Sequence, residues 1–147
     1  MRLTKTTSYS VRILVDCAAA GGKLVKTSEI AKRLDITPLN VFKIIHILSR
    51  MGFVEAFRGR NGGVRLTRPA DQIRIGEIVR AIEATEVGIE DDAAGGGKRN
   101  LKAVFDDALE AFIGVLDQHT LADLIHSRGG KRAAKPGAVS RSTHPRG

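Results

Sequence analysis

The sequence predicts a mainly α-helical fold with one small β-hairpin, and three observations support this prediction. Apolar residues recur at helical spacing in several segments of the chain. Two short apolar runs, FVEAF and VRLT, flank a glycine-rich segment, which is typical of a hairpin. The chain has 147 residues, of which 42% are hydrophobic, and this is enough to form one core.

Two helices are predicted within the first 34 residues. Residues 7–20 carry apolar side chains at i, i+3, i+4 and i+7, and Gly21 ends this helix. Residues 28–34 form a shorter helix, which either Thr27 or Ser28 is expected to cap.

A third helix is predicted to run to Met51. Thr37 can cap it, and Pro38 suits its first position because the N–H of that position needs no partner. Leu39, Phe42 and Ile47 lie near the exposed side of this helix, which is more apolar surface than a purely solvated helix carries. At 100° per residue, the inward face contains Val41, Ile44, Ile45 and Leu48, and the outward face contains Asn40, Lys43, His46 and Arg50.

A hairpin follows the third helix. Residues 53–57 and 64–67 are its strands, and Pro69 ends it because proline cannot extend a strand ladder. Short helix, tight turn, longer helix and hairpin in this order describe a winged helix-turn-helix, with the hairpin as the wing. A fourth helix is predicted within residues 73–84.

A long C-terminal helix begins at Leu101, and a short capped helical turn at 120–125 follows it. Ile113 and Val115 widen the apolar stripe that the predicted dimerisation residues form along the long helix. A helix this apolar needs a cover, and a second copy of the chain is the expected one. The predicted dimerisation residues are Leu101, Val104, Phe105, Ala108, Leu109, Phe112 and Leu116.

Charge is distributed unevenly along the chain. The net charge is +9 in residues 1–69, −7 in residues 70–127 and +6 in residues 128–147. This asymmetry indicates a polyanion-binding module joined to a part that does not touch the polyanion. We divide the chain into a winged helix-turn-helix at 1–84, a loop at 85–100, the dimerisation helix with a short final helix at 101–127, and a basic disordered tail at 128–147.

The sequence also predicts a cytoplasmic protein. It contains no run of 18 apolar residues and no signal-peptide pattern near its beginning, so we expect no association with a membrane. Its single cysteine, Cys17, fits a reducing compartment. Cys17 lies among alanines and is expected to be a buried small hydrophobe, with a redox role as the alternative.

The third helix and the wing predict binding to double-stranded DNA. A helix fits the major groove, where residues near its N-terminal end, such as Asn40 and Lys43, can read base edges. Glycines at a hairpin tip let the backbone approach closely, so that arginines there reach phosphates or a narrow minor groove. The predicted DNA-binding residues are Ser28, Thr37, Pro38, Leu39, Asn40, Lys43, His46, Arg58, Arg60, Asn61, Gly62 and Arg65.

Other functions find less support in the residues. The wing arginines could be a solvated turn, or the module could bind an acidic protein instead of DNA. No nucleophile, base and orienting group occur together, so an enzyme is not expected. His119 and His126 lack a third strong ligand nearby, and we predict no metal site.

Four blocks of the sequence are similar to one family of bacterial regulators. They are LTKTTSYSVRILV, VFKIIHILSRMGFVEAFRGRNGGVRL, IRIGEIVRAIE and LKAVFDDALEAFIGVLDQHTLADLI. Together they resemble the Rrf family, which includes NsrR, IscR and RirA, and the wing and TLADL blocks are most similar to the NsrR branch. The resemblance implies a homodimeric winged-helix transcription factor that binds a palindromic operator and usually represses.

The chain departs from this family at the sensor. The resemblance implies an iron–sulfur cluster held by three cysteines ahead of the dimerisation helix, but residues 86–100, EVGIEDDAAGGGKRN, contain no cysteine. Ser8 stands where some members have a ligating aspartate. Since thiolates supply most of the holding power for such clusters, we predict no cofactor.

Several interpretations of this departure remain open. The chain could be a cluster-free regulator that senses a small ligand or the state of Cys17, a constitutive DNA binder, or a regulator whose cysteine segment was removed by design. It could also sense nitric oxide, iron or redox state through an atypical cluster on residues such as Glu90, Asp91 or His119. Oxygen and nitrogen ligands hold such soft clusters poorly.

Overall fold

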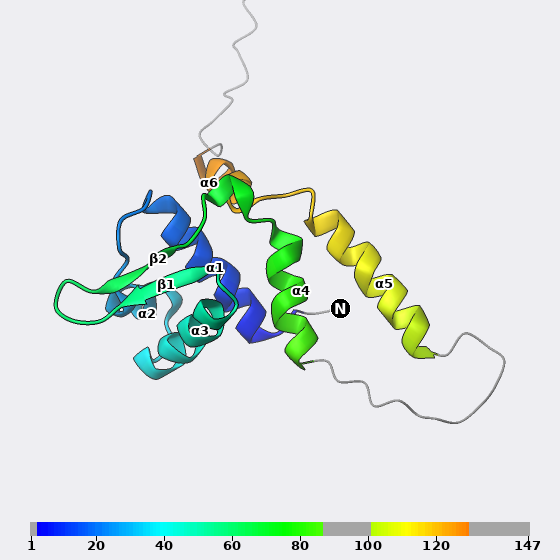
Figure 1. Cartoon of the computed structure of the whole chain (residues 1–147), viewed down its shortest axis with the longest axis horizontal. Coiled ribbons are helices and arrows are strands. Elements are labelled where there is room, and N and C mark those ends of the chain that lie inside the picture. The colour runs from blue at the N-terminus through cyan, green and yellow to red at the C-terminus, as the bar shows by residue number, and fades with distance from the viewer. Residues whose placement is uncertain (1–2, 87–100, 130–147) are drawn as a thin grey trace, which may run out of the picture.

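The structure is a computed structural model that describes residues 3–86 and 101–129. Helices dominate it, and a two-stranded antiparallel hairpin projects from one side of the helical body (Figure 1). No helix in these two ranges is long and apolar enough to cross a membrane. The elements in chain order are α1 (Lys5–Ala19), α2 (Thr27–Leu34), α3 (Pro38–Arg50), β1 (Val54–Phe57), β2 (Gly63–Leu66), the 3-10 helix η1 (Ala70–Gln72), α4 (Ile75–Glu86), α5 (Leu101–Leu116) and α6 (Leu121–Gly129).

Helix α1 lies at the centre of the fold and contacts α2, α3, α4, α6 and β2. It begins two residues earlier than the periodicity predicts, because the side chain of Thr4 accepts a hydrogen bond from the Thr7 backbone N–H at 3.2 Å and caps the helix. Ile13 and Leu14 are fully buried on it.

A buried carboxylate ties α4 to the beginning of α1. Glu83 of α4 accepts a hydrogen bond from the Thr7 hydroxyl at 2.6 Å and two more from the hydroxyl and backbone N–H of Thr4, each at 3.2 Å. Buried polar groups are stable only when they are hydrogen-bonded, and these three donors meet that condition.

The helix-turn-helix is largely as predicted. Thr37 caps α3 by accepting from the Asn40 N–H at 3.3 Å, with Pro38 at the first turn. The tight turn before α3 has Asp35 in the left-handed conformation. The predicted cap of α2 is wrong, because Lys26 is the N-cap residue and no side chain caps that helix.

The wing is a short antiparallel hairpin in which Val54 pairs with Leu66 and Phe57 with Gly63. Val25, which precedes α2, adds a further bridge, since it exchanges two backbone hydrogen bonds of 2.9 Å with Val64. The hairpin is therefore fixed at its base to the connection between α1 and α2.

The segment that leads into α6 returns to the body beside α1. A backbone bridge joins Arg74 and Thr120, with hydrogen bonds from Ile75 N to His119 O at 2.9 Å and from Leu121 N to Ile73 O at 3.0 Å. Helix α6 then packs against α1 and η1. It extends beyond the short turn predicted from the sequence.

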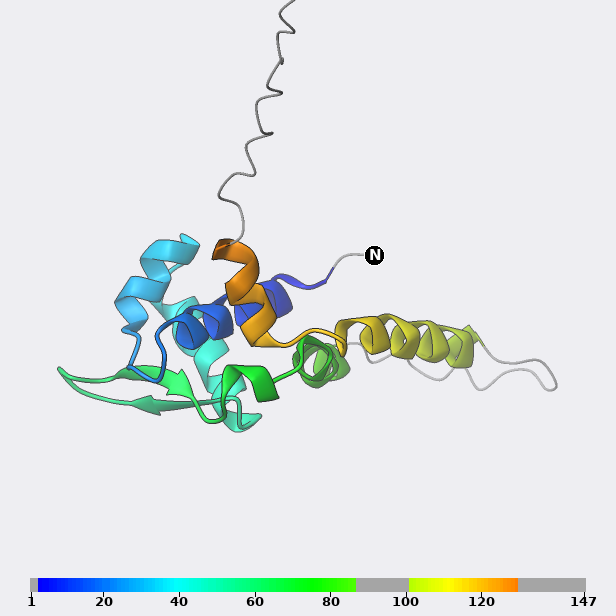
Figure 2. The ribbon, with the colours of Figure 1, turned by 90° about the horizontal axis from the view of Figure 1, so that it is seen from above.

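Helix α5 packs against α4 and reaches away from the rest of the molecule (Figure 2). Gly76 of α4 allows the close approach, because a Cβ there would lie 2.7 Å from the carbonyl oxygen of Ile113. The predicted loop at 85–100 lies outside the described residues except for 85 and 86, which end α4. The predicted tail lies outside them except for 128 and 129, which end α6.

Candidate nucleic-acid interface

One face of α3 is fixed in the core, and the opposite face is open. The four predicted inward residues are all buried. On the outward face, Asn40, Lys43, His46 and Arg50 are exposed. Helix α3 contains no Asp or Glu, so its open face carries positive charge only.

The tip of the wing depends on two glycines. Gly59 has φ +104°, a conformation that L residues with a side chain rarely adopt. Gly62 donates to the Gly59 carbonyl at 2.9 Å, and a Cβ on Gly62 would collide with the carbonyl oxygen of Phe57. The tight tip therefore leaves Arg58 and Arg60 exposed at its surface.

The three wing arginines have different surroundings. Neither Arg58 nor Arg60 forms an ion pair with any described residue. Arg65 is held on the side of the hairpin, because its Nε lies 2.6 Å from Glu55 and its guanidinium lies 5.0 Å from the centre of the Phe57 ring. A phosphate would have to compete with Glu55 for Arg65.

A groove of about 750 Å³ separates α3 from the wing. It brings together predicted site residues from three elements: Ser28 of α2, His46 of α3, and Arg58, Arg60 and Gly62 of the wing. Thr37, Pro38, Leu39, Asn40 and Lys43, at the N-terminal end of α3, do not line the groove, and neither do Asn61 and Arg65.

Lys26 and Phe57 also line this groove, although neither was among the predicted site residues. Lys26 precedes α2, whose first turn has no side-chain cap. Uncapped N–H groups at a helix start favour anions. The position of a lysine directly before a predicted helix start was the signal in the sequence that could have identified it.

The predicted dimerisation stripe of α5 is divided between two environments. Ile113 enters the core of its own chain, and Leu109, Phe112 and Leu116 are partly buried against that core. The other predicted residues, together with Val115, remain exposed: Leu101, Val104, Phe105 and Ala108. An apolar face that no described residue covers thus continues along α5.

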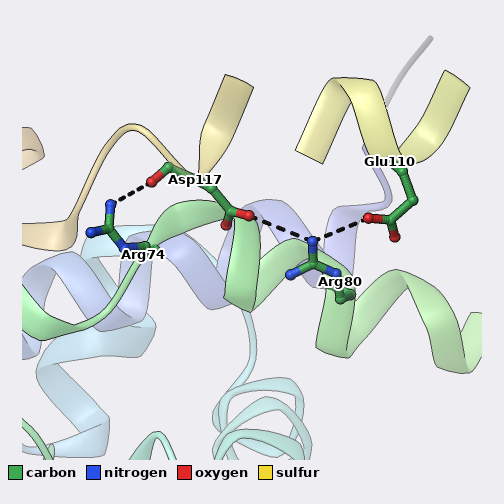
Figure 3. Close-up of polar contacts among 4 residues, drawn as sticks. All are labelled: Arg74, Arg80, Glu110 and Asp117. Carbon is green, nitrogen blue, oxygen red and sulfur yellow. Dashed lines mark hydrogen bonds and ion pairs between the residues drawn. The ribbon is translucent and has the colours of Figure 1, made fainter. Parts of the chain in front are cut away.

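Polar contacts hold α5 on α4 (Figure 3). Arg80 of α4 lies 3.3 Å from Glu110 and 3.5 Å from the side chain of Asp117. Arg74 donates to the Asp117 carbonyl oxygen at 2.6 Å. These contacts support the C-terminal half of α5.

The donor atoms of the chain do not fit a cysteine-ligated cluster. Cys17 is the single cysteine of the sequence, and its side chain is 1% exposed in the core. No three His, Cys, Asp or Glu side chains of the described ranges are grouped so that they could hold a metal ion. His119 is exposed, His126 contacts the Ala122 carbonyl oxygen at 2.7 Å, and Glu90 and Asp91 lie outside these ranges.

Burial determines the chemistry of Cys17. Desolvation, with a smaller contribution from the charge of Asp16, raises the pKa of the thiol from 9.0 to about 12. The reactive thiolate is therefore suppressed near neutral pH, which disfavours the redox role.

This shift predicts a stability loss at alkaline pH. The unfolded chain ionises Cys17 near pH 9.0 and the folded chain near pH 12, so stability is unaffected below pH 9.0 and falls as the pH rises through that window. At pH 10.5 we expect a loss of about 2 kcal/mol. Urea unfolding of the wild type and of Cys17→Ala at pH 7.5 and pH 10.5 measures it. An equal pH effect in both proteins would contradict the prediction.

Known proteins that are similar to this chain in sequence or in structure include several transcriptional regulators. The family model "Rrf2: Iron-dependent Transcriptional regulator" matches residues 3–127. Protein aau3 of Rhizobium meliloti (strain 1021) is 43% identical over 134 residues, 87% of this chain and 87% of that protein. The HTH-type transcriptional regulator NsrR of Bacillus licheniformis is 38% identical over 135 residues, 85% of this chain and 92% of that protein. The solved structure of T. potens IscR gives a TM-score of 0.71 at 25% identity, covering 90% of this chain and 93% of that one.

Proposed function

We propose that the chain, which belongs to the Rrf2 family of transcriptional regulators, binds a palindromic operator as a homodimer and represses transcription. The chain is a DNA-binding winged-helix regulator and not an enzyme, as the sequence predicted. The observation that carries the finer proposal is the exposed, carboxylate-free face of α3 beside a wing whose Arg58 and Arg60 form no ion pair with any described residue.

Base reading is assigned to the N-terminal half of α3. Lys43 and Asn40 are exposed there, and they can bond guanine and adenine edges in the major groove. Arg58 and Arg60 at the wing tip are assigned to phosphates or to a minor groove. Ser28 and the uncapped start of α2 are assigned to a phosphate between these two positions.

The exposed apolar face of α5 supports the dimer. Exposed apolar patches on a helix are usually covered in the working assembly, and a two-fold pair of α5 helices would cover this face with itself. Two winged modules related in this way match the two halves of a palindrome.

The proposed regulator has no cysteine-ligated iron–sulfur cluster. One buried cysteine with a suppressed thiolate cannot replace three thiolate ligands. Anaerobic purification followed by visible absorption, iron and sulfide analysis tests this part. A colourless, iron-free protein that binds DNA is the expected result, and a brown protein with stoichiometric sulfide contradicts it.

Two substitutions separate base reading from backbone contact. Lys43→Ala should weaken binding to an operator duplex selected from a random pool about 5- to 150-fold and leave random duplex nearly unaffected, since one base contact is worth about 1–3 kcal/mol. Arg60→Ala should weaken binding to both duplexes. Fluorescence titrations with each duplex at two salt concentrations measure these effects.

The same titrations test DNA binding itself. A steep loss of affinity with salt is expected because phosphate contacts release counterions. A flat salt response would instead favour a module that binds acidic proteins. Equal losses on operator and random duplex for Lys43→Ala would remove its base-reading role.

A further inference from the structure

The side of α3 that is proposed to face DNA carries two large apolar side chains that remain exposed in the described part of the chain. Leu39 is 63% exposed and Phe42 is 55% exposed. Within residues 3–86 and 101–129, neither belongs to the hydrophobic core or packs against its edge, whereas the opposite side of the same helix is buried. Their exposure to water therefore requires another explanation than folding.

Helix geometry places Leu39 at the middle of the open face. With 3.6 residues per turn, Lys43 and His46 lie within about 40° of Leu39 around the helix axis, while Asn40 lies about 100° away. Phe42 lies about 60° from Leu39, on the side where it lines the groove beside the wing. The surface that would enter a DNA groove thus has an apolar centre with the cationic Lys43 and the imidazole of His46 beside it.

This combination favours one kind of partner. The positive charge of Lys43, Arg58 and Arg60, without a carboxylate on α3, complements a polyanion. The apolar centre requires an apolar group within that polyanion. In the major groove of DNA the C5-methyl group of thymine is the one apolar group, and it distinguishes thymine from the other bases.

We propose that Leu39 and Phe42 read the methyl groups of thymines at neighbouring base pairs in each operator half-site. This inference rests on the proposed function, because it specifies the bases that the same helix recognises. Leu39 and Phe42 are separated by about 4.5 Å along the helix axis, which is close to the rise of about 3.4 Å per base step. The two side chains can therefore meet adjacent steps.

The expected effect follows from the burial of one methyl group. Covering a methyl group with an apolar side chain raises the association constant of the complex about fourfold. Cytosine in the same position presents no methyl group and an amino donor that neither side chain can satisfy. Thymine is therefore favoured over both deoxyuridine and cytosine.

The experiment begins with selection of bound sequences from a random duplex pool by the full-length chain. Duplexes of the selected sequence are then prepared with deoxyuridine in place of one thymine at a time, which removes a single methyl group. The wild type, Leu39→Ala, Phe42→Ala and Arg60→Ala are titrated with every duplex. Both tested side chains are exposed, so the variants should remain folded, and circular dichroism checks this.

In each half-site, deoxyuridine at either of two neighbouring thymine positions should weaken binding of the wild type about fourfold. Leu39→Ala should lose the penalty at one of them and Phe42→Ala at the other, while Arg60→Ala should keep both penalties despite its lower affinity. Indifference of the wild type to deoxyuridine would overturn the inference and leave DNA binding intact, as would penalties that persist in both variants. Failure to select or bind any duplex would overturn the proposed function instead.

Discussion

Replacement of Phe105 by glutamate is expected to convert the proposed dimer into a monomer. Phe105 lies on the exposed apolar face of α5, and symmetry places the new charge in the interface twice. An unpaired buried charge costs several kcal/mol, so the dissociation constant of the dimer should rise at least about 10³-fold. Affinity for a palindromic duplex should then fall about 10²- to 10⁴-fold, because two half-sites are no longer engaged together.

Sedimentation equilibrium and operator titration measure the two effects of this substitution. Phe105→Leu is the matched control, since it keeps an apolar side chain and should preserve the dimer. Unchanged circular dichroism would show that the glutamate variant still folds. A glutamate variant that remains dimeric would place the interface elsewhere.

Replacement of Gly76 by alanine is expected to destabilise the fold by about 1–3 kcal/mol. The added Cβ would collide with the side chain of Asp117 and lie 2.7 Å from the backbone oxygen of Ile113. Asp117 could turn aside, but only by leaving Arg80, and the backbone at Ile113 cannot move without shifting α5. Urea unfolding measures the change in the free energy of unfolding.

Gly114 on α5 provides the matched control. Beyond its own helix backbone and chain neighbours, a Cβ at Gly114 would meet no atom of the described residues within 4 Å. Gly114→Ala should therefore be neutral or stabilise the protein by up to about 1 kcal/mol through helix propensity. Equal destabilisation by both substitutions would show that the contact between α4 and α5 is not the cause.

Local signals allowed the sequence to predict the helix-turn-helix and the wing. The Thr37 cap with Pro38 behind it defines the start of α3, and the glycine-rich segment defines the hairpin. Each signal acts within a few residues, so tertiary contacts do not need to be known. Where local signals competed, as at the start of α2, the prediction failed because the backbone begins its helix at Thr27 rather than after it.

Contacts between distant segments could not be predicted. From the sequence alone, Glu83 cannot be told from a surface carboxylate. In the structure it is buried, because Thr4 and Thr7 converge on it from the beginning of α1. The apolar stripe of α5 appears as one surface, yet Ile113 belongs to the core of its own chain. Both results depend on how α4 and α5 are placed relative to the rest of the fold.

The candidate site shows the same limit. Composition indicated which residues carry positive charge, but the structure shows that Arg65 is bound by Glu55 across the hairpin while Arg58 and Arg60 have no such partner among the described residues. Cross-strand pairing places Glu55 opposite Arg65, and this register is known only once the strands are aligned.

The burial of Cys17 has a practical consequence for fluorescence studies. Thiol-directed dyes react with accessible thiolates, so at neutral pH they should leave this side chain unlabelled. The native sequence can then serve directly as the background for single-site labelling. A cysteine introduced at Asn61, on the exposed tip of the wing, would be the one reactive thiol, and a dye attached there would report the approach of the wing to a duplex in real time.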